Sequence, residues 1–147
     1  MKKMAAIIGL VLMSSTVFAG NCISIDLNEG QERIKAIEGL SQERQSLHFE
    51  ILKNAKTTQL LSCAGMGESI SKEDADFAIA ELVASKKTTI RSLNNQVSFL
   101  TDGLADQNLS EVKRTVYSDS LKLVRQQLQD LQNKPDMAIA KIKQLSR

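Results

Sequence analysis

The clearest pattern in the chain is a regular apolar stripe between residues 79 and 104. Its positions alternate in spacing between four and three residues: Ile79, Val83, Lys86, Ile90, Leu93, Val97, Leu100 and Leu104. These spacings place the side chains on one face of a long helix, as in a coiled-coil seam, with Lys86 as the polar interruption. Two arrangements fit the seam: a parallel pair of two copies, or packing against other helices of the same chain. The second needs no partner and is the simpler interpretation.

Similar spacings along the rest of the chain predict an all-α fold, a compact helical bundle of about five helices with one long coiled-coil-like helix and one disulfide. We expect the helices near residues 28–39, 41–63, 71–105, 110–132 and 135–146. Ser41 and Ser71 are suitable N-caps, and either Asn108 or Ser110 can cap the helix expected over residues 110–132. Gly39 is a suitable helix stop, and Pro135 suits the first turn of the last helix. The chain has a single proline and lacks the regular turn signals of a β-sandwich.

The helix expected over residues 71–105 is longer than its neighbours. At 1.5 Å per residue it spans about 50 Å, against about 33 Å for the helix expected over residues 41–63. Part of its apolar seam therefore either extends beyond the neighbouring helices or is covered by the short first and last helices. If it extends, it forms an exposed strip, and such strips usually mark interfaces, with a second copy of the chain as the simplest partner. The candidate interface residues are Val97, Phe99, Leu100 and Leu104.

The first nineteen residues have the organisation of a cleaved signal peptide. Lys2 and Lys3 precede an apolar run over residues 4–13, and Val17 and Ala19 place small residues at the −3 and −1 positions of a cleavage site. The run is about ten residues long, too short for the roughly twenty that cross a bilayer. The sequence therefore predicts a signal peptide over residues 1–19 and a single helical domain over residues 20–147, periplasmic or secreted and without membrane insertion after cleavage.

Lipid attachment at Cys22 is the alternative interpretation of the export signal. It requires a small residue directly before the cysteine, but Asn21 occupies that position. We therefore favour the form without a lipid.

Cys22 and Cys63 are the only two cysteines of the chain, and export would place them in an oxidising compartment, where a structural disulfide is the default. A redox pair would need C-x-x-C spacing, and a metal site would need more donors than two thiols and the lone His48. An unbroken helix over residues 28–62 would be about 50 Å long, whereas residues 22–27 span at most about 20 Å. An intramolecular bridge therefore requires a helix break, best placed at Gly39 to Ser41. A bridge between two chains would remove this requirement.

Composition excludes several classes of binding protein. Lys2 and Lys3 account for the formal net charge of +2, so residues 20–147 carry no excess of positive charge for nucleic acid or anionic lipid. Positive charge is concentrated in residues 110–147, which indicates either helices of opposite charge packed together or a basic partner-binding face. Tryptophan is absent and aromatic residues are 3% of the chain, too few for a typical carbohydrate or single-stranded nucleic-acid site.

No group of residues has the pattern of a catalytic, cofactor or metal site. His48 is the only histidine, and no nucleophile accompanies it in a strand-to-helix turn. Glu73, Asp74 and Asp76 could bind a cation, but acidic residues at the start of a helix are explained more simply by capping and the helix dipole. The sequence therefore predicts a protein that is not an enzyme and holds no cofactor or metal.

The remaining hypotheses concern protein binding. The first is an exported, non-catalytic protein-binding module, such as an immunity or inhibitor protein or an accessory factor of an envelope machine. The second is a periplasmic chaperone or stress adaptor that holds envelope clients. The zero net charge and few methionines of residues 20–147 favour the first hypothesis. A small periplasmic hydrolase is a third hypothesis with little support. No motif indicates a particular family.

Overall fold

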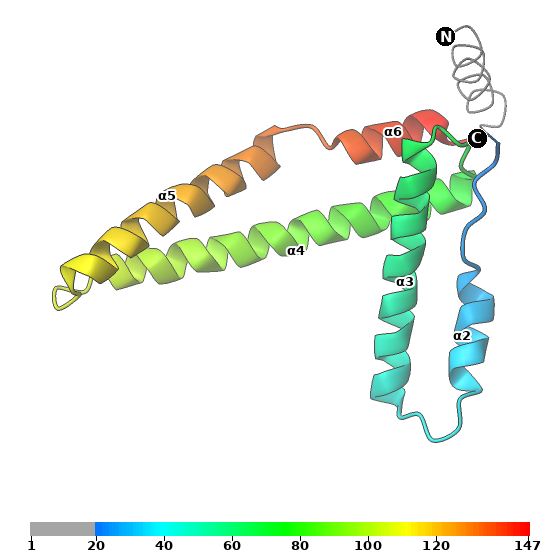
Figure 1. Ribbon diagram of the computed structural model, residues 1–147, viewed down its shortest axis with the longest axis horizontal. Helices are drawn as coiled ribbons and strands as arrows, with labels where there is room; N and C mark the ends of the chain where they lie inside the picture. The colour runs from blue at the N-terminus through cyan, green and yellow to red at the C-terminus, as the bar shows by residue number, and fades with distance from the viewer. Residues whose placement is uncertain (1–19) are drawn as a thin grey trace, which may run out of the picture. The chain divides into compact units, whose positions relative to one another are not determined.

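A computed structural model describes residues 20–147, and over these residues the predicted all-α fold class is confirmed. Figure 1 shows the helices in chain order. Their bounds are Leu27–Lys35 (α2), Gln42–Gly65 (α3), Lys72–Leu104 (α4), Glu111–Asn133 (α5) and Met137–Leu145 (α6). The predicted signal peptide, residues 1–19, lies outside the described residues.

Three of the helices begin at serines that the sequence indicates, and Ser110 rather than Asn108 caps α5. In each case the serine Oγ accepts a hydrogen bond from the backbone N–H three residues further along, as an N-cap does. The pairs are Ser41 with Arg44, Ser71 with Asp74, and Ser110 with Lys113.

The predicted break near Gly39 is present, although α2 ends at Lys35, earlier than expected. Gly39 has a φ of +73°, which lies in the left-handed region that glycine adopts without steric cost. The chain then reverses, and α3 runs back alongside α2 (Figure 1). Gly30 allows this close approach, because a Cβ at that position would overlap the side chain of Leu52.

The last helix begins two residues later than predicted. Pro135 lies before α6 rather than in its first turn. Lys134, directly before the proline, is extended, with φ −85° and ψ 135°. The ring of a following proline disfavours helical geometry at the preceding residue, so residues 134–136 form a linker between α5 and α6.

The described residues divide into two compact units. The first unit contains residues 20–80 and Met137–Arg147, and the second contains Glu81–Asp136. Helix α4 therefore contributes its first residues to one unit and the remainder to the other. The prediction that residues 20–147 form a single domain stays a prediction.

The first unit is built from segments that are far apart in the sequence. Leu60, Ile70 and Ile142 are its largest fully buried side chains, and they come from α3, the loop before α4, and α6. Beside this core, the backbone around residues 69–70 pairs in parallel with both ends of the described chain. The four hydrogen bonds, all 2.8–3.0 Å long, are Cys22 N–H to Ser69 O, Ser69 N–H to Gly20 O, Ile70 N–H to Leu145 O, and Arg147 N–H to Ile70 O.

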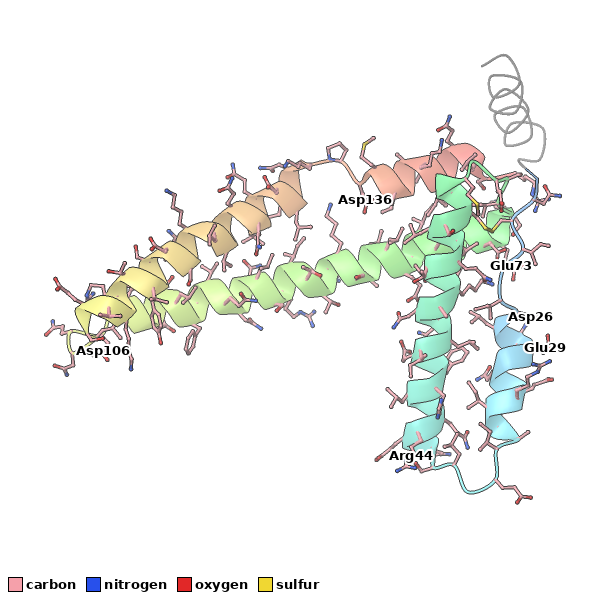
Figure 2. All side chains as sticks on the ribbon, in the orientation of Figure 1. Asp26, Glu29, Arg44, Glu73, Asp106 and Asp136 are labelled. Atoms are coloured by element: carbon pink, nitrogen blue, oxygen red, sulfur yellow. A yellow bond between two sulfur atoms is a disulfide. The ribbon has the colours of Figure 1, made fainter. Side chains whose placement is uncertain are left out.

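The second unit is a hairpin of two helices, the C-terminal part of α4 and α5. Its core is one seam of four buried side chains, Leu93, Leu100, Leu121 and Val124. Arg114 closes the turn between the helices, because its guanidinium donates 3.0 Å hydrogen bonds to the backbone oxygens of Leu104 and Asp106. Asp106 lies in this turn in Figure 2.

Candidate functional site

The disulfide predicted between Cys22 and Cys63 is confirmed, with 5.7 Å between the two Cα atoms. Its yellow bond is visible in Figure 2. A carboxylate oxygen of Glu68 lies close by, so that the two sulfurs and this oxygen are all within 4.8 Å of one another. Thiolates are the metal-binding form of cysteine. Because each sulfur is bonded to the other, this group offers no thiolate, and we interpret it as structural.

Asp74, one of three acidic residues considered for a cation site, is held by groups of the protein itself. Its Oδ1 is 2.9 Å from Nζ of Lys56, and its Oδ2 accepts a 2.8 Å hydrogen bond from the Ser24 hydroxyl. Burial alone would raise the pKa of Asp74. Hydrogen bonds from Lys56, Ser24 and Ser71 and the charge of Lys56 outweigh burial, so the pKa lies below its ordinary value of 3.8.

Lys56 and its neighbour on α3 also fix the segment before α2. The buried Lys56 ammonium donates a 3.0 Å hydrogen bond to the backbone oxygen of Ile25. The Gln59 side-chain oxygen accepts a 2.9 Å hydrogen bond from the backbone N–H of Ile25. This polar cluster therefore ties residues 22–26 to α3 and α4, beside the disulfide. The contacts of Asp74 within this cluster are sufficient to explain its position, without a bound cation.

The remaining residues with catalytic chemistry are dispersed. His48 is exposed on α3, and no hydrogen bond or ion pair joins it to another residue of the described range 20–147. Glu73 and Asp76 are exposed near the start of α4, where Figure 2 labels Glu73. Within the described part of the chain, no side-chain hydrogen bond or ion pair joins any of these three to a serine, threonine or cysteine.

The candidate interface of α4 differs from its predicted form. Leu100 is buried in the seam with α5, and Val97 and Leu104 are partly buried against the same seam. The predicted exposure is therefore wrong for these three residues, because α5 packs against them. Phe99 is different, because it is 66% exposed. Its role in an interface stays a prediction.

The apolar face of α5 is buried over only part of its length. The helical spacing of the apolar residues predicts one face made of Val112, Val116, Leu121, Val124, Leu128 and Leu131. The last four of these pack in the seam together with Tyr117, whereas Val112 and Val116 are exposed, and so is Leu123. From Tyr117 to Leu131 the packed positions alternate in spacing between four and three, and this regular spacing separates them from Val112 and Val116.

We call Phe99, Val112, Val116 and Leu123 the exposed apolar set. The three residues of α5 are separated by four and seven positions, so they share one face of that helix. Phe99 connects α4 to α5 through Tyr117, the residue after Val116, with 6.0 Å between the ring centroids. Gly103 leaves room for this contact, since a Cβ there would meet the Tyr117 ring at 2.6 Å. The second unit thus presents apolar side chains from both of its helices to solvent.

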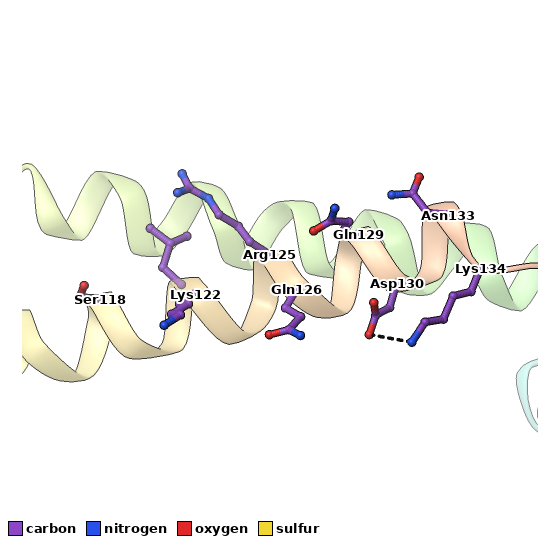
Figure 3. A pocket seen from close by; sticks show the side chains of 9 residues that line it. Ser118, Lys122, Arg125, Gln126, Gln129, Asp130, Asn133 and Lys134 are labelled. Carbon is purple, nitrogen blue, oxygen red and sulfur yellow. Dashed lines mark ion pairs between the residues drawn. The ribbon is translucent and has the colours of Figure 1, made fainter.

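A different stripe of α5 is polar and carries positive charge. It borders a shallow groove of about 650 Å³ (Figure 3), in which Lys134 forms a 3.4 Å ion pair with Asp130. The charged and amide side chains that line it include Lys122, Arg125, Gln126, Gln129 and Asn133. This groove includes part of the positive charge of residues 110–147, and it lies on the second unit.

Comparison with known proteins gives no further guidance. The chain matches no protein-family model, and no curated protein or solved structure is significantly similar to it. Among the described residues, no helix is long and apolar enough to cross a membrane.

Proposed function

We propose that the chain is an exported, non-catalytic protein-binding module of the periplasm, with one dedicated protein partner. An immunity or inhibitor protein, or an accessory factor of an envelope machine, is the expected class. The partner binds the exposed apolar set of the second unit.

The observation that carries the proposal is the exposure of Phe99. Of the three phenylalanines in residues 20–147, Phe49 and Phe77 are half-buried and only Phe99 is exposed. Aromatic side chains are enriched at protein interfaces and supply much of their binding energy when a partner covers them. Exposed valines on α5 add apolar area on the same unit.

Export is supported by two independent features. Residues 1–19 have the charge and apolar pattern of a signal peptide. The Cys22–Cys63 disulfide is of the kind that forms and persists in oxidising compartments.

A chaperone that holds many clients is the second candidate. It is favoured by the exposure of Met66 and Met137, which lie in the first unit, because methionine-rich surfaces adapt to varied partners. Two separate methionines are a small surface for this purpose, so the dedicated binder is the better-supported function.

Affinity capture from an envelope extract of the source cell tests the proposal. The tagged, exported chain should retain one protein at an equimolar ratio, resistant to washing in moderate salt. Many proteins captured below equimolar ratio would favour the chaperone. Recovery of the chain from the cytoplasm with its cysteines reduced would contradict the proposal altogether.

A further inference from the structure

The seam between α4 and α5 continues into a hollow at the open end of the hairpin. Towards the start of the second unit, the α4 face that carries Leu93 continues through Thr89, Lys86 and Leu82. Opposite these residues are Leu131, at the end of α5, and Pro135 of the linker, and together they border a hollow of about 420 Å³. All residues that line it belong to the second unit.

Apolar and charged groups meet in this hollow. Leu82, Leu131 and Pro135 supply apolar walls, and Lys86 is a half-buried cation within it. Across residues 20–147, no hydrogen bond or ion pair engages the side chain of Lys86. The other charged groups at the hollow already have partners. Lys134 pairs with Asp130 at 3.4 Å, and Asp136 has a polar partner of its own.

This combination is typical of small-ligand sites, which are mostly apolar with a few polar groups that fix the orientation of the ligand. We infer that the hollow binds a small amphiphilic anion, a carboxylate with an unbranched apolar chain, whose charged group meets Lys86 while its chain lies against Leu82, Leu131 and Pro135. A cation placed in partly apolar surroundings gains from an anionic partner, because such charge-assisted hydrogen bonds are stronger than neutral ones. The inference does not depend on the proposed function.

The larger groove on α5 is a poorer candidate for the same ligand. Polar groups make up a larger share of its lining than in the hollow, and that lining comes from α5 and Lys134 alone. The hollow at Lys86 combines both chemistries and has walls from both helices.

Titration calorimetry with decanoate, below the concentration at which it forms micelles, tests the inference on the full exported chain with its disulfide intact. Decanol serves as the neutral probe of the same chain length. Lys86→Gln removes the cation, and Lys87→Gln is the matched control, because Lys87 is the exposed neighbour outside the hollow. Circular dichroism confirms that each variant keeps its helical content.

We expect decanoate to bind the unmodified chain more tightly than decanol does, and Lys86→Gln to weaken decanoate binding about tenfold. Lys87→Gln should leave it unchanged. Absence of decanoate binding, equal binding of decanol, or equal loss in both variants would overturn the inference. If decanoate does not bind but Lys86→Gln abolishes capture of the protein partner, the hollow belongs to the protein interface and the inference is wrong.

Discussion

The first unit is closed by contacts between distant segments of the chain, whereas the second consists of two helices joined by one turn. In the first unit, residues far apart in the sequence are joined by a disulfide between positions 41 residues apart, by four backbone hydrogen bonds between chain segments, and by the ion pair of Lys56 with Asp74. In the second unit one apolar seam and the contacts of Arg114 and Tyr117 hold the hairpin together.

Under the proposed function, this difference assigns a separate role to each unit. The second unit is a hairpin with a single seam, so most of the surface of both helices is open to solvent. The exposed apolar set lies on this surface. The first unit fixes the ends of the described chain and has the covalent bond that survives in an oxidising compartment. We therefore regard the first unit as the stable scaffold and the second as the unit that presents binding surfaces.

Removal of the disulfide should have the largest effect and should act on the first unit. The bridge joins residues 41 positions apart, so the double variant Cys22→Ser, Cys63→Ser should lower the free energy of unfolding by about 3–4 kcal/mol. Denaturant titration monitored by far-ultraviolet circular dichroism measures this loss.

The single tyrosine of the chain, Tyr117, provides the matching control for the second unit. It lies in the α4–α5 hairpin, so its near-ultraviolet signal reports on that unit. In the absence of denaturant we expect the signal to persist in the double serine variant. Its disappearance would show that the hairpin depends on the disulfide, and the division between scaffold and presenting unit would be wrong.

Truncation of the hairpin seam should have the next largest effect. Leu100→Ala removes a buried side chain from a core of only four such residues, and we expect it to lower the free energy of unfolding by about 2–3 kcal/mol. Leu47→Ala is the control, because Leu47 is exposed on α3 and its truncation should change the free energy by less than about 0.5 kcal/mol. Similar losses in the two variants would mean that the seam is not the main support of the hairpin.

The ion pair of the first unit predicts a dependence of stability on pH. Because the pKa of Asp74 lies below 3.8 in the folded chain, folding favours the charged carboxylate. The resulting stabilisation is complete above the pKa of the unfolded chain and is lost as the pH falls through the folded-state value. At neutral pH, Asp74→Asn should lower the free energy of unfolding by about 1–3 kcal/mol, because it weakens the interactions of the buried Lys56.

Unfolding measured between pH 7 and pH 2 checks this prediction. The difference between the unmodified chain and Asp74→Asn should shrink below pH 3.8 and vanish once Asp74 is protonated. Asp76→Asn, at an exposed position on the same helix, should show little difference at any pH. A constant difference for Asp74→Asn across the whole range would contradict the role assigned to its charge.

Much of the fold follows from local signals in the sequence. The helix starts at Ser41, Ser71 and Ser110 and the turn at Gly39 depend on short-range backbone chemistry, and the structure confirms them. The disulfide was predictable because the chain has only two cysteines and the distance argument required a reversal between them. The sequence places Pro135 in the first turn of the last helix, but the structure leaves it in the linker before α6.

The surfaces were harder to predict, because exposure depends on which helices pack together. The seam residues Val97, Leu100 and Leu104 were correctly placed on one helix face, but the sequence alone did not show that α5 covers them. Val112 and Val116 are predicted on the same apolar face as Leu121 and Val124, yet only Leu121 and Val124 pack in the seam. The contact of Lys56 with Asp74 joins positions that no local pattern connects.

The central claim is that the second unit binds the protein partner through its exposed apolar set, and paired charge substitutions test it most directly. Phe99→Asp with Val116→Asp alters the set on the second unit. Leu47→Asp with Ile51→Asp alters two exposed apolar positions on α3 of the first unit. We measure equimolar capture of the partner from envelope extract by each variant, after circular dichroism has confirmed its helical content. The account predicts that the first variant loses the partner and the second retains it. Retention by the Phe99 and Val116 variant, or equal loss by both, would contradict the account.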